Sequence, residues 1–310
     1  MGVLWRMAEP SPSSPGMVNW GLLLLLGVIW GTAFMGVSVA LDGFGVLTVT
    51  AGRVALGALA LIVAGPLIGQ GIGRLTSVRE WTFACIIGVA TLALPFTLLS
   101  YGLTHVPSAF AGVTMGAVPL LVLPLVAVFS PEEGIGPRRI IGVCLGFVGL
   151  VLLVGDGALD RTGRDAEWLG RLACIGAACC YAIGSVLTRR APAMPPVSFA
   201  AASLLMGALV MVPLALWQEG VPQAVPLVPS LALIYVALFP TGLAAILRVR
   251  IITTAGSLFM SQVSYMVPVW AVIFGIVLLG EALSPTLFIA LAVILAGILL
   301  SQWRSLFGPR

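Results

Sequence analysis

The sequence has very little charge and no lysine. Charged residues make up 8% of its 310 residues, whereas a soluble domain carries about 25%. Hydrophobic residues make up 60%, and the mean hydropathy is +1.15. Such a composition cannot build a surface that faces water. The sequence therefore predicts an all-α integral membrane protein that crosses the lipid bilayer several times, because each crossing needs about 20 mostly apolar residues.

The scarcity of reactive side chains excludes several kinds of site. Without lysine the chain has no phosphate-binding loop of the Walker type, so we do not expect ATP to drive it. The single histidine, His105, cannot hold zinc alone, and the five cysteines lack metal-ligand spacing. The apolar segments also lack the paired carboxylates or Ser/His pairs that an intramembrane enzyme needs. We therefore expect no metal, no cofactor and no catalytic residue.

The apolar segments, separated by joints rich in glycine and proline, predict ten transmembrane helices. A Pro/Ser-rich N-terminal tail (1–18) is expected to be disordered and cytoplasmic. A polar extracytoplasmic linker (156–167) follows the fifth segment, and a short cytoplasmic tail (304–310) ends the chain. The expected helices cover 19–40, 46–66, 80–101, 106–129, 138–155, 168–188, 197–217, 229–248, 254–279 and 285–303.

The basic residues are all arginine, and their distribution predicts the orientation. If the N-terminus is cytoplasmic, 11 arginines lie on the cytoplasmic side and 3 on the other, with Arg53 inside the second span. The positive-inside rule then places both termini in the cytoplasm. The scattered arginines form no patch for nucleic acid. An ionisable group inside a membrane is a functional candidate, but we expect Arg53 to snorkel to the outer surface.

The two halves of the chain resemble each other at an offset of 149 residues. This offset aligns Pro119 with Pro268 and Glu132 with Glu281. Because five spans per repeat is an odd number, the second copy would enter the membrane upside down. Two inverted five-helix repeats around a central cavity are a transporter architecture, and chance similarity between apolar helices is the alternative. The two glutamates end helices and are expected to cap helix ends or make gate contacts. The two copies cover 19–155 and 168–303.

Three stretches carry a resemblance to a known family: GVIWGTAF (27–34), AFAGVTMGAVPLLVLPLVAVFSPEE (109–133) and SLFMSQVSYMVPVWAVIFGIVLLGEALS (257–284). They resemble the drug/metabolite transporter superfamily, in its ten-span amino-acid-exporting branch, and by overall pattern its bacterial aromatic amino-acid exporters. This resemblance covers nearly the whole chain. It implies export of amino acids and similar metabolites across the bacterial inner membrane. The first copy reads SPEE where the family tends to have Gly-Glu, as at Gly280–Glu281.

Aromatic and hydroxyl side chains near mid-depth mark one part of the expected substrate site. Trp30 and Tyr181 lie too deep for an interfacial aromatic belt, and Thr32 is the repeat partner of Tyr181. A buried indole N–H or phenol needs a hydrogen-bond partner, which a substrate cavity supplies. The alternative is helix packing across Gly27 and Gly31, which form a small-xxx-small pair.

The ninth predicted helix carries the other part of the expected site. Gln262 has an amide that is costly toward lipid, so it should face protein or water. Tyr265 and a stripe of small residues, Ser261 among them, lie beside it, and close helix packing is again the alternative. Met115 belongs to the corresponding stripe in the first copy. The predicted substrate-binding residues are Trp30, Thr32, Met115, Tyr181, Ser261, Gln262 and Tyr265.

Four prolines inside predicted helices are candidate hinges. Each removes one backbone hydrogen bond and bends its helix. Matched bends in both halves are typical of alternating access, and static curvature is the alternative because proline is common in membrane helices. The four are Pro95, Pro119, Pro240 and Pro268.

These features favour a solute transporter over an intramembrane enzyme or a structural protein. A strongly anionic substrate would require several cavity arginines or lysines, so a neutral amino acid fits better. The span interiors hold no carboxylate or histidine, and Tyr and Arg titrate near ~10 and above ~12. We therefore expect facilitated rather than proton-coupled export. Export of other small metabolites or drugs, with proton coupling, is the alternative.

Overall fold

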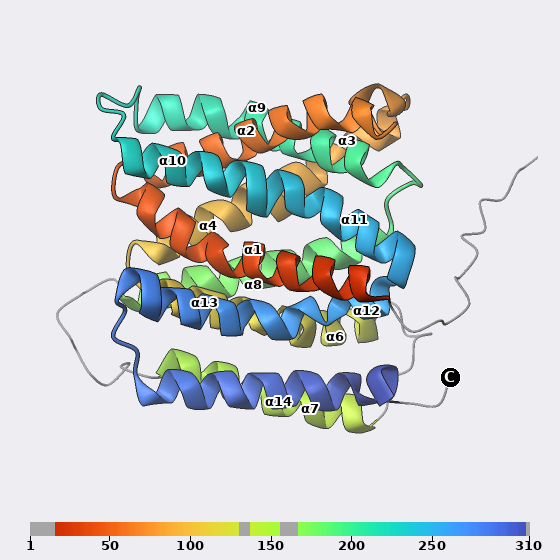
Figure 1. The fold of residues 1–310 in the computed structure, drawn as a ribbon, viewed down its shortest axis with the longest axis vertical. Helices are drawn as coiled ribbons and strands as arrows, with labels where there is room; N and C mark the ends of the chain where they lie inside the picture. Colours follow the sequence, from red (N-terminus) through yellow and green to blue (C-terminus); the bar gives the residue numbers. More distant parts are fainter. Residues whose placement is uncertain (1–15, 130–136, 156–166, 308–310) are drawn as a thin grey trace, which may run out of the picture.

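A computed structural model of the chain describes residues 16–129, 137–155 and 167–307. These residues are helical apart from short joints and contain no β-strand (Figure 1). The described chain begins and ends at the same end of the helix bundle. Glu132, most of the predicted linker and parts of both tails lie outside the described residues.

The elements follow one another with short connections. They are α1 (Met17–Leu41), α2 (Val46–Leu67), a short 3-10 helix η1 (Ile72–Arg74), α3 (Val78–Ile87), η2 (Gly88–Ala93), α4 (Leu94–Leu103), α5 (Ser108–Gly116), α6 (Val118–Phe129), α7 (Pro137–Gly155), α8 (Glu167–Arg189), α9 (Pro196–Gln218), α10 (Leu227–Val236), η4 (Ala237–Leu243), α11 (Ala244–Ala255), α12 (Ser257–Ser261), α13 (Val263–Leu279) and α14 (Pro285–Phe307).

The lengths and outer surfaces of these helices fit a lipid bilayer. Within the described ranges, seven helical stretches are long and apolar enough to cross a membrane, and three shorter apolar helices accompany them. Large apolar side chains face outward on the paired helices α2 and α9, where Leu59, Val63 and Leu209 are each more than half exposed. Exposed apolar side chains of this kind fit a surface that contacts lipid. The protein is therefore a multi-pass membrane protein. The number of transmembrane helices, ten, stays a prediction.

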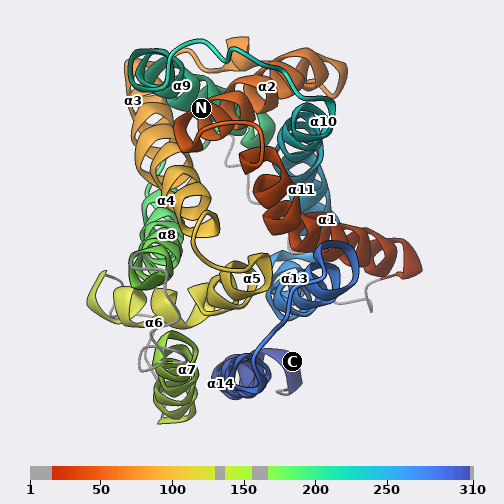
Figure 2. The ribbon, with the colours of Figure 1, turned by 90° about the vertical axis from the view of Figure 1, so that its left-hand side faces the viewer.

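The helices are arranged as a ring when viewed along their axes (Figure 2). Helices α3, α4 and α8 form one side, and α1, α10 and α11 form the other. Helices α2 and α9 pack together across one end of the ring, while α5 and α13 close the other end. Helices α7 and α14 form a separate pair beyond α5 and α13.

Helix α13 packs closely between α1 and α5 because both neighbours present glycines to it. A Cβ atom on Gly31 would overlap Trp270 of α13. A Cβ atom on Gly116 of α5 would come within 2.7 Å of Pro268. Small residues let helix backbones approach in this way. The helix packing across Gly31, which the sequence offered as the alternative to a cavity, is thus present.

Two long helices change to π-helix at corresponding places. The segment η2 lies between α3 and α4, and η4 lies between α10 and α11. Their first residues, Gly88 and Ala237, are 149 residues apart, which is the offset of the sequence repeat. The prolines nearby do not match in the same way: Pro240 lies inside η4, whereas Pro95 lies just after η2 at the start of α4. In this part of the two halves the π-helical turns repeat, whereas Pro95 and Pro240 do not.

Two predicted helix boundaries were wrong. The helix expected to end at residue 248 continues to Ala255, and the break comes at Gly256, whose φ is +89°. Arg248 and Arg250 lie inside this helix, before its last turn. The helix expected over 106–129 starts at Ser108 and is interrupted at residue 117, where α5 gives way to α6.

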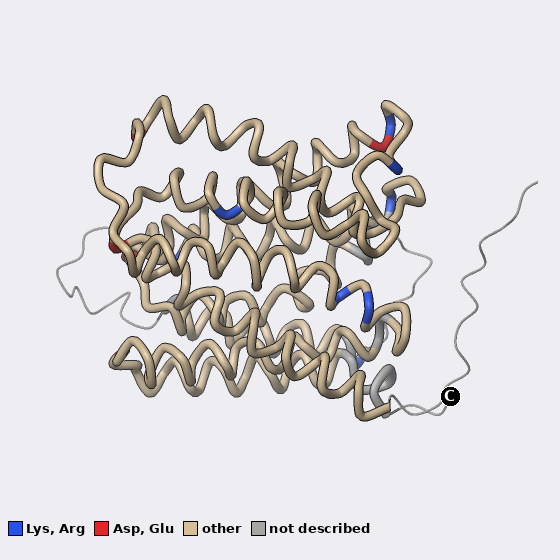
Figure 3. The backbone as a smooth tube through the Cα atoms, turned by 45° about the horizontal axis from the view of Figure 1, so that its top comes forward, with Lys and Arg blue, Asp and Glu red and all other residues tan. Residues whose placement is uncertain are grey.

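Charge is divided between the two ends of the bundle (Figure 3). Lys and Arg, shown in blue, gather mainly at the end where the described chain begins and ends. Along the chain, Arg74 ends η1, Arg79 lies in the first turn of α3, and Arg248 and Arg250 lie inside α11. This clustering agrees with the arginine distribution that predicted the orientation. Which end faces the cytoplasm stays a prediction.

Candidate functional site

The π-helical segment η4 carries the best-connected group of polar side chains in the interior of the bundle. Its Pro240 has no N–H, so the Val236 carbonyl lacks the donor that a regular helix would supply from residue 240. The Thr241 hydroxyl donates to this carbonyl at 3.0 Å. A π-helical turn of this kind frequently marks a functional site in a helix.

Helix α1 contacts the same segment through Trp30 and Thr32. The indole Nε1 of Trp30 donates to the carbonyl oxygen of Pro240 at 3.2 Å. The Thr32 and Tyr235 hydroxyl oxygens are 2.5 Å apart, and Thr32 also donates to the Ile29 carbonyl at 2.9 Å. Because a hydroxyl has only one proton, Tyr235 is the donor to Thr32 in this arrangement. Both predicted residues of α1 therefore hold the segment from α10 to η4.

Arg53 contacts η4 from the other side, and the prediction that it snorkels to the surface was wrong. Its side chain is buried, with 7% exposure. Its Nε donates to the Thr241 hydroxyl oxygen at 3.0 Å, and its guanidinium carbon lies 3.7 Å from the centre of the Phe96 ring. The hydroxyl acceptor and the cation–π contact hold the charge inside the bundle. Snorkelling would have required a free path to the outer surface.

Tyr181 lies near this arginine through a shared aromatic neighbour. Its ring centre is 6.4 Å from that of Phe96, with the two planes tilted by 59°. Tyr181 and Phe96 pack in the apolar cluster of α2, α4 and α9. Trp30 packs instead against the cluster that surrounds α1, α5 and α13. The predicted aromatic pair therefore lies in two different packing clusters, joined through η4 and Arg53.

The remaining predicted site residues lie on α5, α12 and α13. Met115 and Tyr265 are half-buried and pack against the same apolar cluster as Trp30. Ser261 ends α12, and Gln262 occupies the break between α12 and α13, where both are half-buried. Their part in a substrate site stays a prediction, as does the hinge role of the four prolines.

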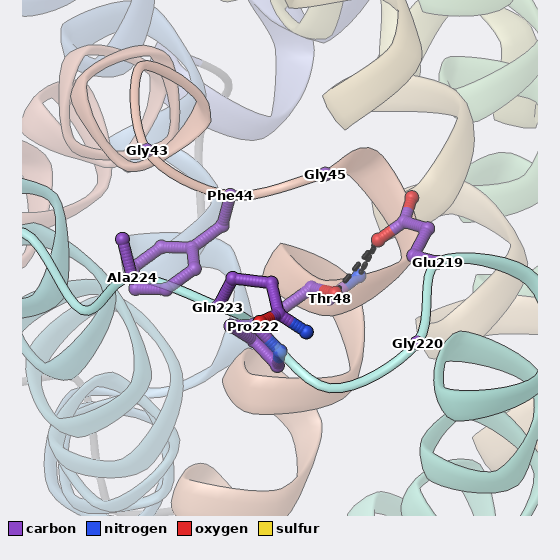
Figure 4. Close-up of a pocket in the computed structure, with 9 residues that line it drawn as sticks. All are labelled: Gly43, Phe44, Gly45, Thr48, Glu219, Gly220, Pro222, Gln223 and Ala224. Carbon is purple, nitrogen blue, oxygen red and sulfur yellow. Dashed lines mark hydrogen bonds between the residues drawn. The ribbon is translucent and has the colours of Figure 1, made fainter.

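Three further polar side chains bind helix N-termini across the two halves of the chain. Glu219, just past α9, accepts hydrogen bonds from the Leu47 and Thr48 amides at 2.9 and 2.8 Å. It also accepts one from the Thr48 hydroxyl at 2.7 Å (Figure 4). Gln70, just past α2, accepts a hydrogen bond from the Val197 amide of α9 at 2.9 Å. Each helix of the pair α2 and α9 is thus capped by a side chain that follows the other.

Glu281 forms the third cap. Its carboxylate accepts hydrogen bonds from the Ser108 amide at 2.6 Å and from the Ala109 amide at 3.1 Å, at the start of α5. Of the two roles that the sequence offered for Glu281, a helix cap or a gate contact, the structure shows the cap. Its repeat partner, Glu132, lies outside the described residues. A pocket of about 140 Å³ beside Glu219 lies in the loops that join α1 to α2 and α9 to α10 (Figure 4), not beside η4.

Sequence reasoning missed Thr241, Phe96 and the burial of Arg53. The repeat held a usable signal, because an offset of 150 residues aligns Thr91 with Thr241 and Arg53 with Ser203. Both threonines lie in π-helical segments, and each donates to a carbonyl in the turn before it. Only the first half, however, places an arginine beside the threonine of the opposite half.

Comparison with known proteins supports a transporter. The sequence model of the EamA-like transporter family matches residues 19–155 and again residues 168–303. The chain belongs to the EamA-like transporter family. The resemblance to the drug/metabolite transporter superfamily is thereby confirmed, and the protein is a membrane transporter.

Individual relatives cover most of the chain. It is 26% identical to the "Probable terminal-alkyne amino-acid exporter" of Streptantibioticus cattleyicolor, over 93% of this chain and 94% of that protein. It is 28% identical to the "Uncharacterized inner membrane transporter YedA" of Escherichia coli (strain K12), over 90% and 89%. A solved crystal structure is similar at a TM-score of 0.66 and 26% identity, and covers 96% of this chain and 100% of that one.

Proposed function

We propose that this EamA-family transporter exports neutral amino acids, aromatic ones included, across the bacterial inner membrane by alternating access. The observation that carries the proposal is the polar cluster at η4. It joins Trp30 and Arg53 of the first matched region to Pro240 and Thr241 of the second. A site between two halves is where a carrier of this architecture binds its substrate. The amino-acid exporter among the relatives supports the substrate class.

The cluster offers the chemistry that a zwitterion with a flat side chain needs. Hydroxyl groups of Thr32 and Tyr235, the indole of Trp30 and one guanidinium lie within a few turns of one another. The Tyr235 and Phe239 rings stack at 5.3 Å and add an apolar surface. A single arginine favours a group with one negative charge over a phosphate, for which several cations are usual.

The same features support alternating access by two inverted five-helix repeats. The π-helical segments recur after 149 residues, and α2 and α9 exchange caps through Gln70 and Glu219. π-helical turns contain backbone groups that are not fixed by a regular ladder, so η2 and η4 are suited to change shape. The interiors of the predicted spans hold no Asp, Glu or His, which supports facilitated transport without proton coupling.

The proposal is tested by counterflow in liposomes that contain the purified protein. Labelled phenylalanine, tryptophan and leucine are compared with a sugar and a cationic drug. Trp30→Phe keeps an aromatic ring but removes the N–H donor to Pro240, and Thr32→Val removes the hydroxyl. Each is expected to lower amino-acid counterflow about 5-fold, the value of one ordinary hydrogen bond.

The matched control for Trp30→Phe is Trp217→Phe, because Trp217 is 79% exposed near the end of α9. Counterflow of the sugar or the drug without counterflow of any amino acid would reject the proposed substrate class. Equal loss in the control and in Trp30→Phe would reject the η4 cluster as the site.

A further inference from the structure

We infer that Arg53 binds the carboxylate of the transported molecule, so that a carboxylate, rather than an amino group or a side chain, is what this site requires. The inference rests on the proposed function and deepens it. It assigns to the site one chemical group of the substrate and one protein residue that recognises it.

The first step is the unbalanced charge of Arg53. Its side chain is 7% exposed, yet no carboxylate of the described residues forms an ion pair with it. The acidic residues that the structure describes lie at helix ends or in the adjoining joints, as Glu219 and Glu281 do. Holding an unpaired cation away from water is costly. An anionic ligand that reaches the guanidinium would remove much of this cost.

The second step is the inventory of donors. A guanidinium has five N–H groups in one plane. Its Nε is occupied by the Thr241 hydroxyl at 3.0 Å, and the Phe96 ring covers one face at 3.7 Å from the guanidinium carbon. Nε is the only nitrogen of the Arg53 guanidinium that has a hydrogen-bond partner among the described residues. The edge formed by the two Nη atoms therefore retains its donors.

The third step is the match between this edge and a carboxylate. Two parallel N–H groups bind the two oxygens of a carboxylate in a bidentate arrangement, which an ammonium group cannot copy. The contacts with Thr241 and Phe96 fix the plane of the guanidinium in advance. Less side-chain entropy is then lost when a ligand binds.

The fourth step is the asymmetry of the two halves. An offset of 150 residues, one more than the offset of the π-helical segments, places Ser203 at the position of Arg53. Its hydroxyl is buried and has no hydrogen-bond partner among the described residues. The second half thus supplies no cation at the equivalent place. One arginine matches one carboxylate per transported molecule.

The test uses the full-length protein in detergent and measures the dissociation constants of six probes. Phenylalanine and phenylacetate carry a carboxylate, whereas phenylalaninamide and phenethylamine do not. Alanine and alaninamide repeat the comparison with a small side chain. We expect the carboxylate probes to bind about 10- to 100-fold more tightly than their amide or amine counterparts.

Substitution of the arginine separates recognition from damage to the fold. Arg53→Gln is expected to weaken the carboxylate probes by that same factor and to leave the amide and amine probes within about twofold. Arg53→Lys keeps the charge but not the bidentate edge, and should lose an intermediate amount. A purely structural role would weaken all probes together. Arg79→Gln removes the same charge from an exposed position and should change nothing.

Two results with the unaltered protein would overturn the inference: equal binding of acids and amides, or no binding of any carboxylate probe. Tight binding of phenylacetate by Arg53→Gln would also overturn it. So would displacement of phenylacetate by equal concentrations of chloride or phosphate. If Arg53→Gln fails to fold, the acid-to-amide ratio of the unaltered protein and of Arg53→Lys still decides. Binding of phenylacetate without any amino-acid counterflow would reject the proposed function and retain the carboxylate site. Amino-acid counterflow without any preference for carboxylate probes over amides would reject the carboxylate site and retain the proposed function.

Discussion

Replacing Glu281 with alanine should release the start of α5 without unfolding the bundle. The carboxylate holds the amides of Ser108 and Ala109, and no side chain from the N-cap residue, Pro107, supplements it. Loss of an N-cap acceptor costs about 0.5–2 kcal/mol, and the attraction of an anion to a helix N-terminus adds about 0.3–1 kcal/mol. Because Glu281 is half-exposed, screening by water brings the expected total to about 1–2 kcal/mol.

This loss is measurable as local hydrogen exchange. Since about 1.4 kcal/mol corresponds to a factor of ten, exchange at the Ser108 and Ala109 amides should rise about 5- to 30-fold in Glu281→Ala. Glu281→Gln keeps one acceptor oxygen but loses the charge, and should raise exchange by about 3-fold. The assay is deuterium uptake followed by mass spectrometry of peptides covering the start of α5.

Glu219→Ala is the matched control, because Glu219 caps α2 through Leu47 and Thr48 in the same manner. It should raise exchange at the start of α2 and leave Ser108 and Ala109 unchanged. The capping argument would be refuted if Glu281→Ala left exchange at these two amides unaltered. A uniform rise throughout the protein would equally refute it, because that pattern indicates global destabilisation.

Three further predictions concern orientation, the substrate site and coupling. A cysteine introduced in place of Ala158, on a background without the native cysteines, should react with an impermeant reagent in intact cells; protection would reject the predicted topology. Trp30→Ala, Gln262→Ala and Tyr265→Ala should each lower transport by about 5-fold or more at normal expression, and normal transport by all three would place the site elsewhere. Liposomes with equal substrate on both sides and an imposed pH gradient should show no uphill accumulation. Accumulation that a protonophore abolishes would reject the facilitator, and its loss in Glu281→Gln would identify the coupling residue.

The composition and periodicity of the sequence were enough to predict the class of fold. Long apolar segments without charge have one stable solution in lipid, because only a helix satisfies its backbone hydrogen bonds within the segment. The proline, glycine and serine clusters likewise marked most helix ends. The family followed from motifs at Trp30, at Pro119 and around Glu281, and the family match over both regions confirmed it. The sequence also offered the capping role of Glu281, with a gate contact as the alternative.

The fate of Arg53 depended on the tertiary structure. A snorkelling arginine and a buried one have the same local sequence, and the outcome depends on whether an acceptor lies in reach. Thr241, 188 positions later in the chain, supplies that acceptor, and the Phe96 ring covers the cation.

The pairing of Trp30 with Pro240 and of Gln70 with Val197 was equally beyond sequence reasoning. Periodicity determines which residues face inward, because it is a property of one helix. Which inward-facing residues meet depends on the rotation, depth and crossing of separate helices, and these are set by packing contacts such as that of Gly31 against Trp270. Contacts of this kind are distributed over the whole chain, so no local stretch of sequence specifies them.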